Sequence, residues 1–244
     1  MSFTAEVAGR FAQAALASGE GEVCAAFRRS FYLRFPGERY ACIGDISLGR
    51  GPLNVLVGEV KIPALGERVS VDNAHAQVWA PPPYQPGRLN IQDLRQAARP
   101  LVPAEGLGCL IVGTHNALSG HAQPALEALE RWLVGNALGA EAEQLIGLGP
   151  GLTPSGDDYL GGMLVALRAC GRGVQADGLW RWLQPRLAGR TSAISAAHLA
   201  AAAAGEAHEA LHDVLNGDLQ LEKLDAVGHC SGWDALAGAL AVLR

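Results

Sequence analysis

The sequence predicts an α+β protein in which an N-terminal antiparallel β-sheet or small barrel is followed by a mostly α-helical layer. After a first helical stretch, short strand-like runs separated by turn residues fill residues 30–79. A stiff, extended proline-rich segment occupies residues 81–87. From residue 122 onward, the apolar residues recur with helical spacing. We therefore expect a mainly β region at 1–87 and a mainly α region at 88–244.

The first region is expected to begin with a helix at 6–17, where apolar residues have helical spacing. Alternation and β-branched or aromatic residues then predict strands. The expected strands are 30–35, 39–46, 54–60, 68–71 and 75–79. A Pro-Gly-Glu turn at 36–38 and a Gly-Arg-Gly-Pro break at 49–52 separate the first three strands.

The second region is expected to contain a helix at 91–98, a short apolar strand at 107–112 and then helices. Glycines divide the helical part into segments. They are Gly135, Gly139, Gly171, Gly173, Gly189, Gly205 and Gly217. The alanine-rich run 198–204 predicts tight helix packing.

Composition limits the class of protein and of partner. The chain has 244 residues, which is long enough for a sizeable core. Charged residues make up 18%, below the roughly 25% of a typical soluble domain, so we expect other subunits or a second copy to cover some apolar surface. The net charge of −5, without a basic run, argues against binding of nucleic acid or of an anionic membrane. We expect a cytoplasmic protein, because no apolar stretch reaches membrane-spanning length and the start lacks a basic signal region.

Five cysteines are scattered along the chain without a CxxC pair. An odd number at irregular spacing does not indicate a disulfide framework or a zinc site. We expect buried thiols in a reducing compartment.

A glycine-rich loop is the first candidate for chemistry. Residues 147–158 read Gly-Leu-Gly-Pro-Gly-Leu-Thr-Pro-Ser-Gly-Asp-Asp and run directly into an apolar, helix-spaced stretch. Glycines let backbone amides approach a ligand closely, and a helix N-terminus presents free N–H groups. The loop is therefore suited to an anion or a polar carbonyl compound.

Two adjacent carboxylates distinguish this loop from a nucleotide-binding P-loop. Asp157 stands where that motif requires lysine, and Asp158 follows it. Carboxylates accept N–H bonds from an amide, carbamoyl or ammonium group, and they also suit Mg²⁺. The structural alternative is a capping box formed by Ser155 and Asp158, with Pro154 in the first turn. That alternative leaves the glycines unexplained.

The same pattern recurs near the C-terminus. Residues 155–164 and 231–240 both read SGxDxLxGxL. If the two helices cross at Gly162 and Gly238, their positive N-terminal ends could point into one pocket. Two independently capped helices are the alternative, with Ser155 and Ser231 as N-caps.

A third polar helix start lies between these modules, at 189–198. Arg190 offers a planar fork for a carboxylate or phosphate, and Thr191 and Ser192 add hydroxyls, although either hydroxyl residue could be an ordinary N-cap. His229, two residues before the second module, could titrate near neutral pH. His208 and His212 have metal-binding spacing but no recognisable third ligand.

These motifs resemble a bacterial family of proteins of unknown function that includes the AllH-like subunits of oxamate carbamoyltransferase. The glycine loop, the Thr-Ser-Ala-Ile-Ser run at 191–195 and the Gly-His-Cys-Ser-Gly-Trp-Asp run at 228–234 carry the resemblance, together with the strand entry at 51–54. It implies a role in anaerobic allantoin catabolism, in which an assembly of different subunits interconverts oxalurate and phosphate with oxamate and carbamoyl phosphate. Cys230 departs mildly from the small or hydroxyl residue expected there.

Carbamoyl transfer needs a phosphate cradle, donors to the carbonyl and acceptors for the NH₂ group, and it needs no redox cofactor. Asp157, Asp158, His229 and Asp234 are our candidates for proton transfer, orientation or amide binding. The candidate substrate-binding residues are Gly149, Gly151, Thr153, Ser155, Gly156, Arg190, Thr191, Ser192, Ser231 and Gly232. We expect no cofactor, with Mg²⁺ left open. The alternatives are a non-catalytic metabolite-binding or scaffold subunit, and a magnesium-dependent phosphotransferase that lacks the P-loop lysine.

Overall fold

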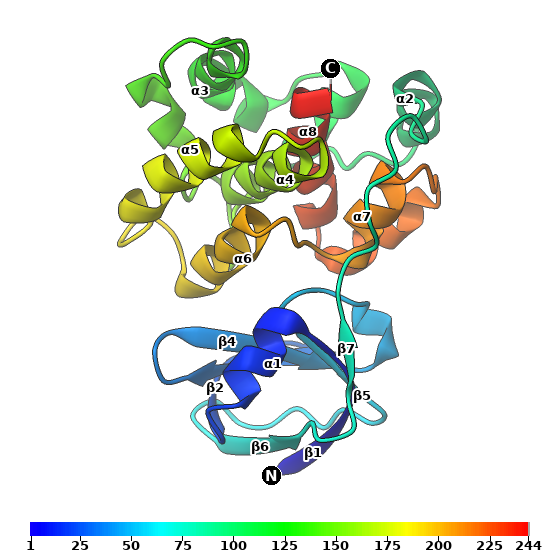
Figure 1. Cartoon of the computed structure of the whole chain (residues 1–244), viewed down its shortest axis with the longest axis vertical. Helices are drawn as coiled ribbons and strands as arrows, with labels where there is room; N and C mark the ends of the chain where they lie inside the picture. Colours follow the sequence, from blue (N-terminus) through cyan, green and yellow to red (C-terminus); the bar gives the residue numbers. More distant parts are fainter. Residues whose placement is uncertain (244) are drawn as a thin grey trace. The chain divides into compact units, whose positions relative to one another are not determined.

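A computed structural model of the chain describes residues 1–243 and divides it into two compact units (Figure 1). The first unit comprises Met1–Pro82 together with Glu206–Glu209, and the second comprises Pro83–Gly205 and Ala210–Arg244. The first unit holds all the strands of the described chain, and the second is built from α- and 3-10 helices. This is the α+β layout that the sequence predicts.

The first unit is a small barrel. Its strands are β1 (Ser2–Gly9), β2 (Gly21–Ala26), β3 (Ser30–Phe35), β4 (Arg39–Gly44), β5 (Asn54–Val57), β6 (Arg68–Asp72) and β7 (Gln77–Trp79). The strand order is β5-β4-β3-β2-β6-β1-β7, and β1 also pairs with β5, which closes the sheet. The barrel is mixed, because β4–β5, β1–β6 and β1–β7 run parallel. Residue alternation is the same in parallel and antiparallel strands, so the sequence could not reveal these directions.

Two expectations for this unit are wrong. The helix expected at 6–17 is α1 (Arg10–Leu16), and the residues before it belong to β1. In β1 the side chains of Phe3 and Ala5 are buried and their neighbours are exposed, which is strand alternation. Strand β2 was not expected, because its small residues lack a strong strand signal.

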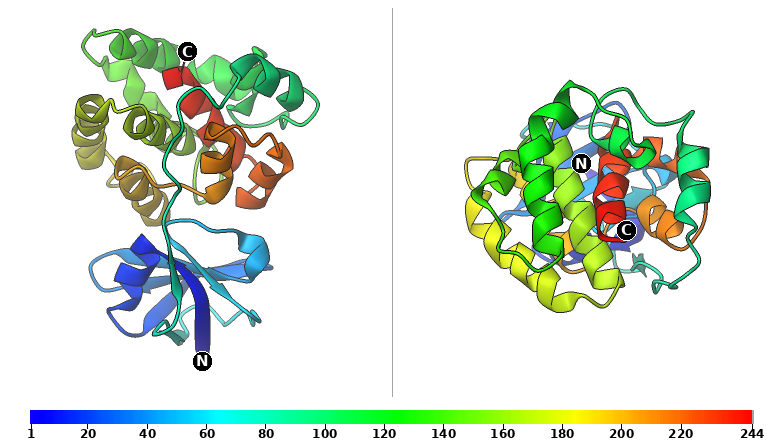
Figure 2. Two further views of the ribbon diagram at one scale, coloured as in Figure 1. Left: turned by 45° about the vertical axis from the view of Figure 1, so that its right-hand side comes forward. Right: turned by 90° about the horizontal axis from the view of Figure 1, so that it is seen from above.

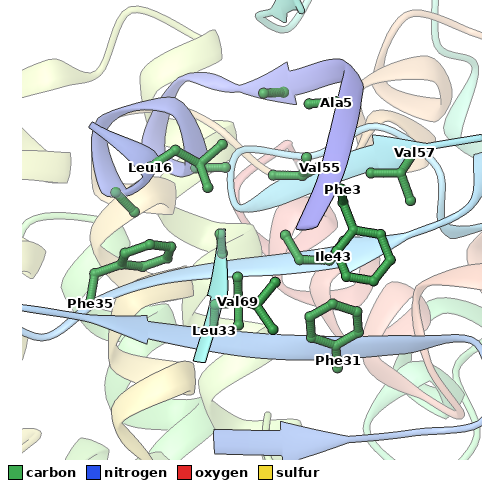
Figure 3. Close-up of a cluster of buried hydrophobic side chains, with 14 of the residues drawn as sticks. Phe3, Ala5, Leu16, Phe31, Leu33, Phe35, Ile43, Val55, Val57 and Val69 are labelled. Atoms are coloured by element: carbon green, nitrogen blue, oxygen red, sulfur yellow. The ribbon is translucent and has the colours of Figure 1, made fainter. Parts of the chain in front are cut away.

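The barrel encloses a compact apolar core (Figure 3). Phe3 and Phe31 pack with their ring centroids 5.5 Å apart. Leu33, Ile43 and Val69 are fully buried beside them. The alternation that defines these strands therefore also supplies the core.

The second unit is helical. Its α-helices are α2 (Ile91–Ala98), α3 (Ala117–Leu133), α4 (Ser155–Ala169), α5 (Gly173–Leu183), α6 (Ala193–Ala203), α7 (Glu209–Leu215), which begins in the first unit, and α8 (Ser231–Leu243). The 3-10 helices are η2 (Gly108–Val112), η3 (Ala140–Leu145), η4 (Gln184–Arg186) and η5 (Leu221–Val227), and η1 (Ile46–Leu48) lies in the first unit. Helix α2 agrees with the prediction, and α3 begins earlier than expected because Asn116 caps it through a capping box.

The strand expected at 107–112 is instead η2. Its apolar residues pack against α8, and a Cβ atom on Gly108 would lie 2.8 Å from Cβ of Trp233. Short apolar runs do not distinguish strand from buried helix, and this run has no strand partner within the described part of the second unit.

The cysteines differ from the expectation that all are buried thiols. Cys42 and Cys109 are buried, whereas Cys24 and Cys230 are half-buried and Cys170 is exposed. All five are free, so no disulfide constrains either unit.

Among residues 1–243, no single helix has the length and apolar character needed to cross a membrane. The pair η5 and α8 passes the same test of length and composition only when taken together, with a bend of 119° between them.

Helices α4 and α8 lie side by side in the second unit (Figures 1 and 2). They cross at the two glycines of the repeated motif, as predicted. A Cβ atom on Gly162 would lie 1.8 Å from the carbonyl oxygen of Ala235. A Cβ atom on Gly238 would lie 1.9 Å from the carbonyl oxygen of Tyr159. Ala235 and Tyr159 occupy equivalent positions in the two motifs, so the contact is reciprocal.

Gly162→Ala is predicted to destabilise the protein by about 1 to 3 kcal/mol, because the methyl group has to push a backbone carbonyl away. Gly161→Ala is the matched control in the same helix, since its methyl group would lie 3.7 Å from the nearest atom, a side-chain carbon of Ala202. The control should be neutral or stabilising, because alanine favours helix over glycine by about 1 kcal/mol. Urea unfolding of both variants checks this, and equal midpoints would contradict the close crossing.

Candidate functional site

The crossing of α4 and α8 brings their N-termini together. The hydroxyl oxygens of Thr153 and Ser231, from the two helix starts, lie 2.9 Å apart. The Ser231 hydroxyl also forms a hydrogen bond with the carboxyl group of Asp158. In the same way, the Ser155 hydroxyl forms a hydrogen bond with the carboxyl group of Asp234. Each serine of one motif therefore faces the aspartate of the other. The expected convergence is confirmed, and a pocket shared by the two ends stays a prediction.

The reciprocal relation extends to the glycine after each serine. A Cβ atom on Gly156 would lie 2.0 Å from the carbonyl oxygen of Leu145, at the end of η3. On Gly232 it would lie 2.4 Å from the carbonyl oxygen of Leu224, in η5. In both modules the helix start thus lies on the backbone of a preceding 3-10 helix. Glycine is required there because no side chain fits between the backbones.

The capping interpretation of the first motif is wrong. The N-cap of α4 is Pro154, without a side-chain capping bond, and Ser155 is the first helical residue. The Ser155 side chain is buried, so it is not an exposed cap. The polar residues at this helix start are therefore available for other contacts.

Asp157 anchors the loops that flank the site. Its Oδ1 accepts the backbone N–H of Gly147 at 2.8 Å. Its Oδ2 accepts the hydroxyls of Thr191 and of Ser195, the latter at 2.6 Å. The side chain is 1% exposed, so these donors replace water around a buried charge. The geometry therefore joins the glycine loop and the start of α6 to α4.

The glycine loop uses backbone conformations that other residues adopt with difficulty. Gly147, Gly149 and Gly151 have φ of 73°, 110° and 96°. A Cβ atom on Gly147 would also lie 2.0 Å from the carbonyl oxygen of Arg190. The loop is thus pressed against the segment that precedes α6. Ser192 completes the junction by donating to the carbonyl of Leu152 at 2.5 Å.

Asp158 and Asp234, which are equivalent in the repeat, each have a buried Oδ2 without a hydrogen-bond partner among the described residues. Burial raises the pKa of Asp158 well above its usual range, and the neighbouring carboxylates of Asp234 and Asp157 raise it further. Burial also raises the pKa of Asp234 to about 6, despite the opposing effect of the Ser155 hydroxyl and two backbone N–H groups. Unpaired buried polar atoms are rare in native proteins, so this pair marks the place where a ligand with N–H donors would bind.

The second oxygen of Asp234 positions a loop that the sequence did not single out. Its Oδ1 accepts the backbone N–H groups of Leu107 and Gly108 at 2.5 and 3.0 Å. Asn116 holds the same loop by donating to the carbonyls of Ala104 and Gly106, at 3.0 and 2.8 Å. The only sequence signal was an asparagine before a helix, which is common and unspecific.

The remaining candidates lie at the edge of this cluster. Arg190 pairs with Glu143 at 2.7 Å, and Glu143 also pairs with Arg186. Ser192 is the N-cap of α6 and accepts the N–H of Ser195. His229 lies on the surface, where its Nε2 is 3.1 Å from Oε2 of Glu105.

The two adjacent aspartates should respond differently to substitution. Asp157→Asn is predicted to destabilise the protein by about 1 to 3 kcal/mol, because one amide oxygen cannot accept all three donors. Asp158→Asn should leave stability unchanged or raise it, because it removes a buried carboxyl group with an unpaired oxygen and a raised pKa. Denaturant unfolding at neutral pH measures both. Equal losses would show that the two carboxylates share one structural role.

Stability should also depend on the ionisation of Asp234. Its pKa of about 6 in the folded protein lies above the ordinary value of 3.8, so the folded state favours the proton. The contribution of Asp234 to the free energy of unfolding is therefore highest below pH 3.8, its pKa in the unfolded chain. This contribution falls by about 2 to 3 kcal/mol as the pH rises through about 6. Asp234→Asn should flatten this part of the pH profile of unfolding free energy, whereas Asp93→Asn, at the exposed start of α2, should not. An unchanged profile in Asp234→Asn would refute the shifted pKa.

Comparison with known proteins gives one match. Residues 145–243 match the family described as oxamate carbamoyltransferase subunit AllH. No curated protein and no solved structure matches the chain. The matched residues include both repeated motifs, the whole glycine loop and the start of α6. This part of the chain is therefore similar to the AllH family.

Proposed function

We propose that this protein is a subunit of a carbamoyltransferase that acts on oxamate or oxalurate and carbamoyl phosphate, or on a related small anionic amide. The match of residues 145–243 to the AllH family supports the reaction class. The observation that carries the proposal is the pair of unpartnered, buried carboxylate oxygens of Asp158 and Asp234 at the converging starts of α4 and α8.

The carboxylate pair suits the nitrogen end of such a substrate. A carbamoyl or oxamate NH₂ group has two N–H donors and needs two acceptors. Asp158 and Asp234 offer one free oxygen each. Burial raises the pKa of both groups, and the value of about 6 for Asp234 lets that carboxylate take up a proton near neutral pH. The site thus binds the amide nitrogen and supplies the base.

The other end of the substrate is negatively charged. The N-terminus of α4 carries roughly half a positive charge, and it begins within the glycine loop at 147–158. Gly149 and Gly151 in the loop would bring backbone amides close to a phosphate or carboxylate. Arg190 would complete the anion site from the rim, since its guanidinium has five donors and Glu143 does not use all of them.

In this proposal the oxamate nitrogen attacks the carbamoyl carbon of carbamoyl phosphate. A C–N bond forms, the C–O bond to phosphate breaks, and the proton from nitrogen passes to Asp158 or Asp234. Backbone N–H groups and the hydroxyls of Thr153 and Ser231 would stabilise the oxygen that gains charge. Phosphate then leaves from the glycine loop.

The proposed enzyme includes further subunits. The chain has a low charged fraction of 18%, which fits a surface that is partly covered in an assembly. A non-catalytic role in the same assembly, as a metabolite-binding or scaffold subunit, is the alternative. The same carboxylates could serve it by binding the ligand without chemistry. We further propose that the assembly works in the cytoplasm.

The test measures phosphate release from carbamoyl phosphate in the presence of oxamate. It is run first with the chain alone and then with the chain mixed with the proteins encoded by neighbouring genes. Asp158→Asn and Asp234→Asn are each predicted to lower kcat/KM by about 10- to 100-fold, the loss of one charge-assisted hydrogen bond. Asp177→Asn, on the exposed face of α5, is the control and should retain activity.

Direct binding separates the alternatives. If oxamate stabilises the chain against heat, and Asp158→Asn removes the effect while turnover by the assembly is unchanged, the chain is a binding subunit. Turnover that requires a nucleotide would favour the phosphotransferase. Full activity of both aspartate variants, together with unchanged stabilisation by oxamate, would refute the proposed site.

A further inference from the structure

A second cluster of potential ligand side chains lies beside the start of α8, outside the proposed substrate contacts. It consists of Glu105, His229 and Cys230, whose ligand atoms all lie within 4.8 Å of one another. Nε2 of His229 is 3.1 Å from Oε2 of Glu105. Glu105 and His229 are exposed and Cys230 is half-buried, so an ion can reach all three from solvent.

Both segments that carry these residues are held in place by buried polar contacts. Glu105 lies in the loop whose carbonyls accept from Asn116 and whose backbone N–H groups donate to Asp234. Cys230 directly precedes α8, and its carbonyl accepts the N–H of Asp234 at 2.9 Å. Asp234 thus connects the two segments, which keeps the three ligand atoms close before any ion binds.

The chemistry of the three side chains selects the ion. A thiolate, an imidazole and a carboxylate together are typical ligands of zinc, which binds sulfur at about 2.3 Å and nitrogen or oxygen at about 2.0 to 2.2 Å. Bonds of this length to a tetrahedral ion place the ligand atoms less than 4.8 Å from one another. The three ligand atoms of this cluster also lie within 4.8 Å of one another, so their spacing is compatible with zinc. Calcium and magnesium prefer oxygen ligands alone.

We propose that Glu105, His229 and Cys230 bind one Zn²⁺ ion. Three protein ligands leave the fourth tetrahedral position to water, which faces solvent because two of the ligands are exposed. The proposal departs from the expectation that the cysteines have no zinc role, since the spacing of Cys230 and His229 in sequence does not reveal that Glu105 joins them. It is independent of the proposed transferase activity.

The electrostatic surroundings favour a cation at this place. Burial raises the pKa of the Cys230 thiol, and four nearby carboxylates raise it further through their negative charge. They belong to Asp234, Glu105, Asp158 and Asp225. Their combined negative potential attracts a divalent cation, and the cation in turn stabilises the thiolate form of cysteine.

The test is a zinc titration of the untagged, metal-stripped full chain against a chromophoric chelator. We expect one zinc per chain. Cys230→Ser and His229→Gln should each weaken binding by about 100-fold or more, since even changes outside the ligand shell cost about 10- to 100-fold. Cobalt bound to the wild-type chain should show a thiolate charge-transfer band that Cys230→Ser lacks.

Matched controls use exposed residues of the same type elsewhere in the helical unit. Cys170→Ser and His121→Gln should bind zinc as the wild type does. His229→Gln changes an exposed side chain, so it should keep the fold even if Cys230→Ser does not. The proposal is overturned if zinc binds the wild type no more tightly than His229→Gln, or if the control variants weaken binding equally.

Discussion

The close crossing of α4 and α8 is the contact on which the helical unit depends. At Gly162 and Gly238 the backbones of the two helices approach to a distance that excludes any side chain. This approach brings both helix starts together, so that the hydroxyls of Thr153 and Ser231 meet at 2.9 Å. Without it, the serines and aspartates of the two motifs would each face their own surroundings. The candidate site is therefore a consequence of backbone packing.

The repeated motif is used symmetrically at some positions and differently at others. Asp158 and Asp234 are equivalent and share a buried environment with an unpaired oxygen each. Their neighbours Asp157 and Trp233 have diverged. Asp157 holds the polar loops through three hydrogen bonds, whereas Trp233 is fully buried in the core beside η2. One module thus carries the glycine loop and the other anchors the site to the apolar interior.

The three carboxylates of this region show how burial assigns roles to identical side chains. Asp157 is satisfied by three donors, which makes its charge part of the framework. Asp158 and Asp234 destabilise the folded protein, because each has a buried Oδ2 without a hydrogen-bond partner. Burial raises the pKa of both groups, which shows that their charged forms are disfavoured there. A fold keeps such a cost at a functional site when the surrounding structure holds the groups in place. Both aspartates lie within the residues that match the AllH family.

The sequence by itself determined the α+β class, the helix at 91–98, the glycine loop and the SGxDxLxGxL repeat, because these depend on local periodicity and on residue types with special backbone freedom. Only the tertiary structure decided which aspartate is satisfied and which is not, since identical neighbours in sequence face different elements. It also decided the parallel strand pairs of the barrel and the approach of Glu105 to His229 and Cys230. These features depend on contacts between residues far apart in the chain, which local patterns do not encode.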